Sequence, residues 1–473
     1  MPKIVLPIAN GFYESDSLPL SAQECTNFYP NIAQAPALNQ ETLFGTPGLV
    51  EVATASDLDN NRGAHEMNGV PYFVVGATLY SMSATYVLTS IGTISGSGRV
   101  SMADNGTQML VLVPGGNGYI YNHVTDAFAK ITDVDFTANG NPQIVVYIDG
   151  FFCLTTDSKK FIVSALNNGL SYNALDFGTA ESDPDEIVAP IVYKNQLFIG
   201  GSQTIEAFQN IGGADFPFQR TGLFLPKGIN SPFSIQLIED TFAFIGSGQN
   251  ESAAIWTLAG NNVQKISTTA IDNELNRLTE DQIKSIYSWS YAQKGAYFVG
   301  FALPGGTFVY DNISKRWHER KSLIEGSLGS YRVASMIRAY NQIWAGDTVD
   351  GRIGLLDPEV YTEYSGQILR TIVTQPFQEN MESFVVPEIE MTLESGVGNA
   401  ASVNPQIGMA RSKDGKTWQD TRFRGIGSIG QYNHRAIWRR NGRASRFELF
   451  RFTMSDPVKP VLIQLTAEIE VGR

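Results

Sequence analysis

Apolar runs separated by pairs of turn residues recur along most of the chain. At Asn68-Gly69, for example, the run VPYFVV follows the turn, and a glycine leads into a second run, TLYSM. Seven such units have turns near residues 69, 106, 150, 195, 240, 295 and 341, so their spacings are 37, 44, 45, 45, 55 and 46 residues. Turn pairs of this kind favour hairpins, and a repeat of roughly 40–50 residues that contains hairpins is typical of a β-propeller.

We therefore predict an all-β fold with a β-propeller of about seven blades over residues 61–360. A series of β-sandwiches is the structural alternative. The 55-residue spacing contains a different pattern, because apolar positions in Ile271–Tyr287 recur near the helical period. Thr279 followed by Gln282 is the signature of a capping box. We predict a small helical insertion near residues 270–288, either as an interaction element or as a plain packing helix.

The two ends of the chain do not follow the repeat. Six prolines interrupt residues 1–60, which argues against a long helix or central strand and favours an N-terminal extended arm. Beyond residue 366 the segments EIEMTL and VLIQLTAEIEV read as strands, the second with half-buried alternation. We predict a C-terminal β-sandwich-like domain over residues 366–473.

Composition agrees with many short strands and tight turns. The chain has 473 residues, 45 of them Gly, with 43% hydrophobic and only 17% charged residues, which excludes a disordered chain. The charge is unevenly distributed. Residues 366–473 hold 14 Lys+Arg and 11 Asp+Glu, a net of +3, so the remainder of a chain with net charge −13 carries −16.

An arginine cluster accounts for this asymmetry. One acid, Glu448, accompanies six arginines in this stretch: Arg435, Arg439, Arg440, Arg443, Arg446 and Arg451. One interpretation is a solvated face whose arginines pair with acids elsewhere on the fold. The other is an interface for an acidic partner, and we take the six arginines as the candidate interface. The acidic body argues against nucleic-acid binding as the main activity, because phosphates repel a negative surface.

Candidate chemistry is sparse. Two cysteines and four scattered histidines give no disulfide framework and predict no metal site or cofactor. Residues 425–430 match GxGxxG, but no helix pattern follows, so we interpret them as a loop. Ser412–Trp418 resembles a sialidase Asp-box one residue short, and an Asp-Gly hairpin turn explains it. No nucleophile–base arrangement occurs, and we predict that the chain is not an enzyme.

Targeting signals are equally sparse. The N-terminal residues lack a long apolar core, and no stretch of about 18 apolar residues occurs. We expect no signal peptide and no membrane span.

Several segments, taken in order, resemble a known family: the packaged-DNA stabilisation proteins, or tail accessory factors, of short-tailed (podovirus) bacteriophages. The resemblance covers nearly the whole chain and is weakest in the first 60 residues. It rests on GSGRVSMA (Gly96–Ala103), SQTIEAF (Ser202–Phe208), PKGI (Pro226–Ile229), TFAFIGSG (Thr241–Gly248), FVYD (Phe308–Asp311) and RAIWRRNGRASRFELFRF (Arg435–Phe452).

This resemblance implies a structural virion protein of the phage tail, assembled in the host cytoplasm. Family members form a homo-oligomeric ring, typically a hexamer, as a hub or nozzle below the portal and the head–tail adaptor protein. The ring seals in packaged DNA, extends the ejection channel, receives a tail needle or plug, and anchors tailspikes or fibres. DNA passes through without sequence-specific binding, which suits an acidic wall. The alternative function is a glycan-binding or glycan-cleaving β-propeller.

Overall fold

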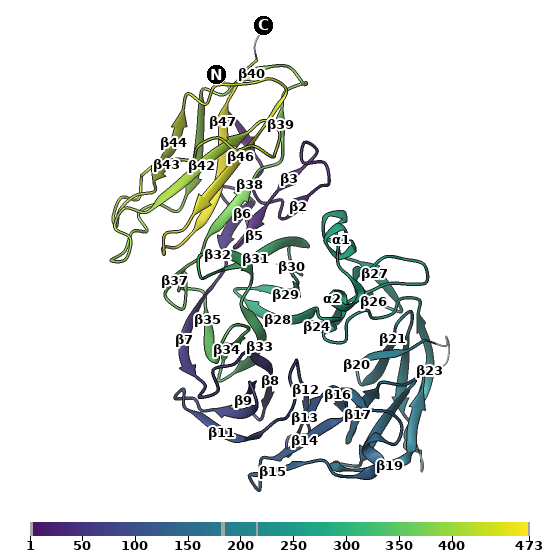
Figure 1. The fold of residues 1–473 in the computed structure, drawn as a ribbon. Coiled ribbons are helices and arrows are strands. Elements are labelled where there is room, and N and C mark those ends of the chain that lie inside the picture. The colour runs from purple at the N-terminus through teal and green to yellow at the C-terminus, as the bar shows by residue number, and fades with distance from the viewer. Residues whose placement is uncertain (1–2, 181–184, 214–215, 472–473) are drawn as a thin grey trace.

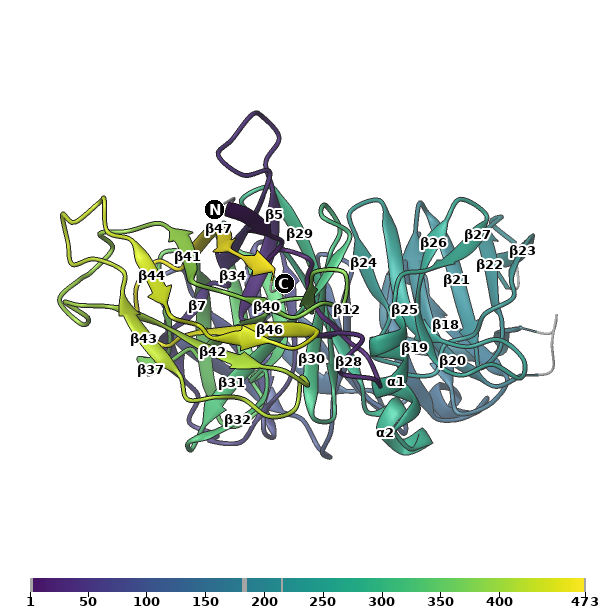
Figure 2. The same cartoon turned by 90° about the horizontal axis from the view of Figure 1, so that it is seen from above.

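The chain forms a ring of β-sheets with a second, smaller β-domain attached at one side (Figure 1). This computed structural model describes residues 3–180, 185–213 and 216–471. Figure 2 shows the smaller domain, with β41, β42 and β46, on one side and the blades that contain β18–β27 on the other. The prediction of an all-β fold that combines a propeller with a C-terminal sandwich is confirmed.

Seven blades surround the propeller axis, and each has four antiparallel strands. Blade 1 is β8 (Asn61–Met67), β9 (Val70–Val75), β10 (Thr78–Met82) and β11 (Leu88–Thr93). Blade 2 is β12 (Ser101–Asp104), β13 (Gln108–Val113), β14 (Asn117–Asn122) and β15 (Ala127–Lys130), followed by the 3-10 helix η1 (Val134–Thr137). Blade 3 is β16 (Pro142–Ile148), β17 (Phe151–Thr156), β18 (Lys160–Ala165) and β19 (Asn168–Thr179).

The remaining blades follow the same order from the axis outwards. Blade 4 is β20 (Ile187–Tyr193), β21 (Gln196–Gly201), β22 (Ile205–Asn210) and β23 (Phe218–Leu225). Blade 5 is β24 (Gln236–Ile238), β25 (Thr241–Gly246), β26 (Ala254–Ala259) and β27 (Asn262–Lys265). Blade 6 is β28 (Tyr287–Gln293), β29 (Ala296–Leu303), β30 (Gly306–Asp311) and β31 (Arg316–Ile324), with β32 (Ser327–Ser330) paired to β31. Blade 7 has β33 (Val333–Ala339), β34 (Gln342–Asp347) and β35 (Arg352–Asp357).

The turn pairs that predicted the repeat join the first two strands of each blade. Several of their residues adopt left-handed backbone angles, as primed hairpin turns require. Asn68 and Gly69 have φ of 55° and 82°, and Lys294 and Gly295 have φ of 47° and 79°. The turn pairs in the sequence therefore predicted the number of blades correctly.

The seventh blade is completed by β7 (Gly48–Thr54), which pairs antiparallel with β35. This pairing closes the ring with a strand from the expected N-terminal arm. Two short strands, β36 (Thr362–Glu363) and β37 (Gly366–Gln367), extend the same sheet on the far side of β7. The buried side chain of Leu49 explains why this segment leaves solvent and joins the blade.

The rest of the expected arm also forms strands. A short hairpin joins β2 (Tyr13–Glu14) and β3 (Ala22–Gln23). The others join larger sheets: β1 (Lys3–Leu6), β4 (Cys25–Thr26), β5 (Phe28–Ile32) and β6 (Glu41–Gly45). Instead of standing apart, residues 3–60 therefore supply strands to both domains, because their apolar residues are buried there: Phe28 and Leu43 in the sandwich and Leu49 in the propeller.

Two facing sheets build the C-terminal domain. One has the order β44-β41-β47-β6-β5 with β1 on β47, and the other runs β4-β38-β46-β42-β43. Their strands are β38 (Arg370–Val373), β41 (Glu388–Leu393), β42 (Gln406–Ser412), β43 (Arg422–Gly425), β44 (Ala436–Arg439), β46 (Phe447–Met454) and β47 (Val461–Glu468). Short strands complete it: β39 (Phe377–Gln378) on β46, and β40 (Phe384–Val385) between β45 (Arg443–Ala444) and β48 (Glu470–Val471).

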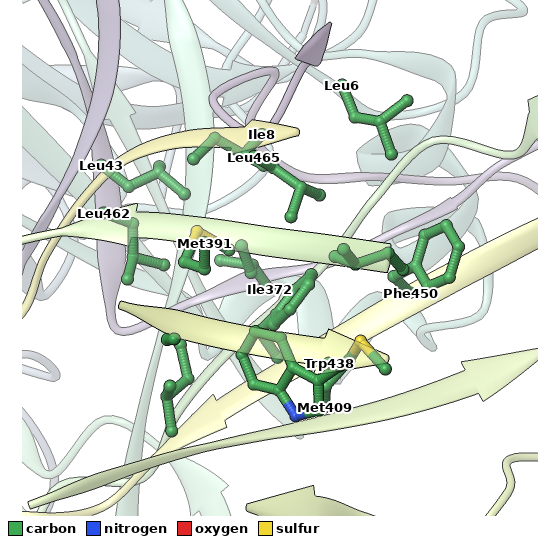
Figure 3. Close-up of a cluster of buried hydrophobic side chains, with 14 of the residues drawn as sticks. Leu6, Ile8, Leu43, Ile372, Met391, Met409, Trp438, Phe450, Leu462 and Leu465 are labelled. Carbon is green, nitrogen blue, oxygen red and sulfur yellow. The ribbon is translucent and has the colours of Figure 1, made fainter. Parts of the chain in front are cut away.

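The core of this domain combines both ends of the chain. Figure 3 shows Leu6 and Leu43 from the N-terminal segment close to Trp438, Phe450 and Leu465. All five side chains are buried. The N-terminal segment is therefore part of the sandwich core.

A continuous sheet joins the two domains. In it, β31 of blade 6 pairs with β4 at Glu319 and Thr26, and β4 pairs with β38 of the sandwich. Because hydrogen-bonded strands cross the boundary, the sandwich is joined to blade 6 through the N-terminal segment. Strand β4 of the N-terminal segment therefore bridges the predicted domain division between residues 360 and 366.

The helical insertion consists of α1 (Thr269–Asn276) and α2 (Glu280–Lys284). The predicted capping box is present, because the Thr279 side chain accepts a hydrogen bond from the Gln282 N–H while the Gln282 side chain accepts one from the Thr279 N–H. Ile271 and Leu275 of α1 are fully buried between blades 5 and 6, which supports a packing role for α1.

One end of the propeller axis is occupied by a side chain. Arg99 precedes the inner strand of blade 2, yet its Nη2 donates to the carbonyl of Ala334 in blade 7 at 2.8 Å. Its guanidinium lies over the ring of Tyr287 in blade 6, with Cζ 4.0 Å from the ring centroid, and 5.6 Å from that of Phe233 before blade 5. Arg99 therefore crosses the axis.

Candidate functional site

The predicted arginine interface falls on an edge of the C-terminal domain. There β43 and β44, the edge strands of the two facing sheets, lie side by side on the part of the sandwich away from the propeller (Figure 1). The Trp438 Nε1 donates to the carbonyl of Arg422 at 2.7 Å, and the Arg424 Nε donates to the carbonyl of Ile437 at 2.8 Å. These bonds satisfy edge carbonyls that would otherwise be exposed.

Two of the six predicted arginines pair with acids of the neighbouring strand β41. Arg435 forms two hydrogen bonds of 2.6 Å to Glu390, and the Arg439 Nε donates to Glu388 at 2.9 Å. Lys3 adds a contact of 3.2 Å to each acid. The Arg435 hydrogen bond lowers the pKa of Glu390, whereas at Glu388 the bonds from Arg439 and Lys3 lower the pKa by more than burial raises it. The first interpretation of the cluster therefore holds for Arg435 and Arg439.

The other four predicted arginines have different surroundings. The Arg443 Nη2 donates to the hydroxyl of Ser383 at 2.6 Å. Arg451 is half-buried, and its guanidinium carbon lies 4.5 Å from the ring centroid of Trp418. The side chains of Arg440 and Arg446 are exposed and make no hydrogen bond or ion pair with any residue that the structure describes, although the Arg440 N–H donates to the carbonyl of Pro387 at 2.8 Å. Of the six, these two therefore retain the most available charge.

Arg422 and Arg424 belong to the same edge but were missed from the sequence. Arg422 donates to the carbonyl of Arg439 at 3.1 Å, and Arg424 is exposed. Their positions two residues apart in the segment TRFRG could have predicted this, because residues i and i+2 of a strand lie on the same face. Exposed apolar side chains lie on this strand and in the loop that follows: Phe423 at 54%, Ile429 at 76% and Tyr432 at 72% exposure. We call Arg422, Phe423, Arg424, Ile429, Tyr432, Arg439 and Arg440 the arginine edge.

Two motifs in this domain have the predicted structural explanations. In the GxGxxG segment, Gly425 ends β43 and residues 426–430 lie in the connection from β43 to β44, without a helix. In the Asp-box-like segment, the Asp414 Oδ1 accepts 2.8 Å hydrogen bonds from the N–H groups of Lys416 and Thr417, which is a hairpin turn. Those backbone bonds lower the pKa of Asp414 to about 2.

Among residues 3–180, 185–213 and 216–471, no group of three or more His, Cys, Asp or Glu side chains is placed to hold a metal ion. No helix in these ranges is long and apolar enough to cross a membrane. Both cysteines are free and buried, and burial raises the pKa of each thiol.

A His–Asp pair that the sequence did not predict joins blades 1 and 2. The His65 Nε2 lies 2.7 Å from the Asp104 Oδ2.

A hollow with several acids in its wall lies on the propeller beside α2. Its volume is about 630 Å³, and its wall includes Asp157, Glu186, Glu251 and Glu280. None of the described residues that line it is aromatic. It therefore lacks the stacking platform that a sugar ring would use.

Comparisons with known proteins match both domains. The family model described as Bacteriophage P22 Gp10, beta-propeller, matches residues 4–361, and the model described as Bacteriophage P22 Gp10, beta-sandwich, matches residues 370–470. The chain belongs to the Bacteriophage P22 Gp10 family. The predicted resemblance to tail accessory factors is thereby confirmed.

One curated relative is the "Tail hub protein gp10" of Salmonella phage P22. It is 23% identical over 421 residues, which cover 86% of each chain. Among solved structures, the extracellular domain of the putative hybrid two-component system BT4673 from B. thetaiotaomicron is 11% identical with a TM-score of 0.43, covering 76% of this chain and 45% of that chain. The WD40 propeller of Doa1 is 12% identical with a TM-score of 0.38, covering 66% and 97%. TM-scores this low carry no weight for function.

Proposed function

We propose that this chain is a structural, non-enzymatic protein of a short phage tail, where it forms part of the tail hub. The observation that carries the proposal is the match of both domains, in order, to the P22 Gp10 family, together with the tail hub relative that covers 86% of the chain. The shared N-terminal segment supports a rigid building block, because strands of residues 3–60 complete both the propeller and the sandwich.

The finer part of the proposal concerns assembly. The chain forms a homo-oligomeric ring, which we propose to be a hexamer, below the portal and its adaptor protein. The ring seals in packaged DNA and anchors a needle or plug and tailspikes or fibres. Because Arg99 crosses the propeller axis, the DNA path in this proposal lies between copies of the chain and not through a propeller. The acidic body, with net charge −16 outside residues 366–473, suits a wall that DNA does not adhere to.

The arginine edge is the proposed contact with a neighbouring tail component that presents acids. Two observations support this contact. The side chains of Arg424 and Arg440 are exposed and form no ion pair with a described residue, and the rings of Phe423 and Tyr432 are exposed on the same edge. Arginine and aromatic side chains are enriched among the interface residues that contribute most of the binding free energy. Arg435 and Arg439 are less suited, since their charges already pair with Glu390 and Glu388.

The glycan alternative has less support. The acidic hollow beside α2 brings acids together but offers no aromatic side chain, whereas a glycan site needs both. Measurable binding of a glycan array component to the purified chain would favour that alternative.

The test of the interface is a double charge reversal, Arg424→Glu with Arg440→Glu, in the phage that encodes this chain. We expect incorporation into particles to fall by about tenfold or more, because like charges would then face each other across the contact. Lys130→Glu, on the exposed outer strand of blade 2, makes the same type of charge change away from the edge and should leave incorporation unchanged. Normal incorporation of the double variant would refute the interface but not the family role.

A further inference from the structure

A cavity that is open to solvent lies along the propeller axis, and it is independent of the tail role proposed above. Its volume is about 560 Å³, within the usual range of small-molecule sites. The inner strands of blades 1 to 6 supply its wall. Much of that wall is apolar: Met102, Ile144, Val146, Ile191, Ile235 and Leu237.

The two ends of the cavity differ in charge. The inner strands of neighbouring blades run in the same direction, so their first residues lie at one end and their last residues at the other. Arg99, Phe233 and Tyr287 precede or begin inner strands and therefore mark one end, which the guanidinium of Arg99 crosses. Asp104 ends β12 and, with its partner His65, lies towards the opposite end.

No carboxylate compensates the Arg99 charge. Among the described residues it forms no ion pair, and its guanidinium contacts the Ala334 carbonyl and the two aromatic faces. Its Nε is shielded from solvent and has no hydrogen-bond partner. Burial lowers the pKa of Arg99 to about 10, which is the expected effect of desolvation without a counter-charge. Arg99 is partly buried, and a partly desolvated cation is stabilised when an anion accompanies it.

From these observations, we propose that the axial cavity binds a small organic carboxylate with an apolar stem. The carboxylate pairs with the guanidinium of Arg99, whose planar donors match two carboxylate oxygens. The stem lies against Met102, Val146 and Ile191. Asp104 sets the orientation, since its negative charge at the other end repels an anionic head. A single negative charge suits the site, because Arg99 is the one Lys or Arg side chain among the described residues that line the cavity.

The probe for this proposal is octanoate, titrated calorimetrically into the full-length chain. We expect octanoate to bind, and Arg99→Met to weaken its affinity by at least tenfold. Octan-1-ol, which has the same stem without the charge, and acetate, which has the charge without the stem, should each bind at least tenfold more weakly than octanoate. Arg446→Met removes an exposed arginine outside the cavity and should bind like the unaltered chain.

A second variant protects the test against misfolding of Arg99→Met. Leu237 lines the cavity and is 42% exposed, so Leu237→Trp can narrow the entrance while Arg99 stays in place. We expect this variant to lose octanoate binding as well. The proposal is overturned if octanoate does not bind the unaltered chain, if both variants bind it normally, or if inorganic phosphate or acetate binds as tightly.

Discussion

Asn27 and Lys321 hydrogen-bond to each other twice, through the Asn27 side chain and the Lys321 main chain. The Asn27 Nδ2 donates to the Lys321 carbonyl at 2.8 Å, and the Lys321 N–H donates to the Asn27 Oδ1 at 3.0 Å. The same Nδ2 also donates to the carbonyl of Leu369 at 2.8 Å. One fully buried amide thus joins the N-terminal segment, blade 6 and the start of the sandwich.

We predict that Asn27→Gly destabilises the chain by about 3 kcal/mol, because three buried main-chain groups lose their partner at about 1 kcal/mol or more each. Glycine accepts the left-handed backbone of this position, where φ is 57°, so the change isolates the side-chain bonds. The measurement is the midpoint of urea unfolding followed by tryptophan fluorescence.

Asn195→Gly is the matched control. Asn195 also has φ of 57° but lies exposed in the first turn of blade 4. Its replacement should change the free energy of unfolding by less than about 0.5 kcal/mol. Equal effects of the two substitutions would show that the amide does not join the domains.

A second prediction concerns the strand that closes the ring. A Cβ on Gly48 of β7 would lie 2.6 Å from the carbonyl oxygen of Val360, which is main chain and cannot move aside freely. Gly48→Ala should therefore weaken the pairing of β7 with β35 and lower the unfolding free energy by about 2 kcal/mol or more.

For Gly48→Ala, the control is Gly329→Ala. Gly329 lies in β32, where an added Cβ meets nothing within 4 Å and no positive φ is required. Thermal unfolding of the two variants gives the comparison. A Gly48→Ala chain as stable as the Gly329→Ala chain would mean that β7 contributes little to ring closure.

The closing strand also shows where sequence reasoning stops. The seven blades could be predicted because each turn pair, such as Lys294-Gly295, acts locally on its own hairpin. The partner of Gly48 is Asp357, more than 300 positions away, and no local pattern links them. Residues 1–60 therefore looked like an arm, although their apolar side chains belong to two cores.

The partners of the clustered arginines could not be predicted from local sequence either. Six arginines in one stretch were visible, but the acids Glu388 and Glu390 that pair with Arg439 and Arg435 lie on another strand. The register of β41 and β44 decides those pairs, and the register depends on the whole sheet.

A third prediction is that the free energy of unfolding depends on pH through His318. His318 is fully buried beside the rings of Tyr29 and Phe298, and neither ring nitrogen has a hydrogen-bond partner among the described residues. Burial, helped by the charge of Arg320, lowers the pKa of His318 to about 3.

Because the folded chain disfavours the protonated ring, protons bind the unfolded state more readily below pH 6.5. The contribution of His318 is fully present above pH 6.5 and is lost as the pH falls towards 3. Between pH 7 and pH 5 it should reduce the free energy of unfolding by about 2 kcal/mol.

Urea unfolding at both pH values measures this loss. In His318→Phe the loss between pH 7 and pH 5 should be smaller by that amount, whereas His434→Phe, at an exposed position, should retain it. An unchanged pH dependence in His318→Phe would contradict the burial argument.

The most direct test of the central proposal is the location of the chain in the particle. Purified virions of the phage that encodes it, imaged by cryo-electron microscopy, should show density for the propeller and the sandwich in the short tail, repeated around the tail axis. Virions that contain no copy of the chain, or that carry it only outside the tail, would contradict the proposal.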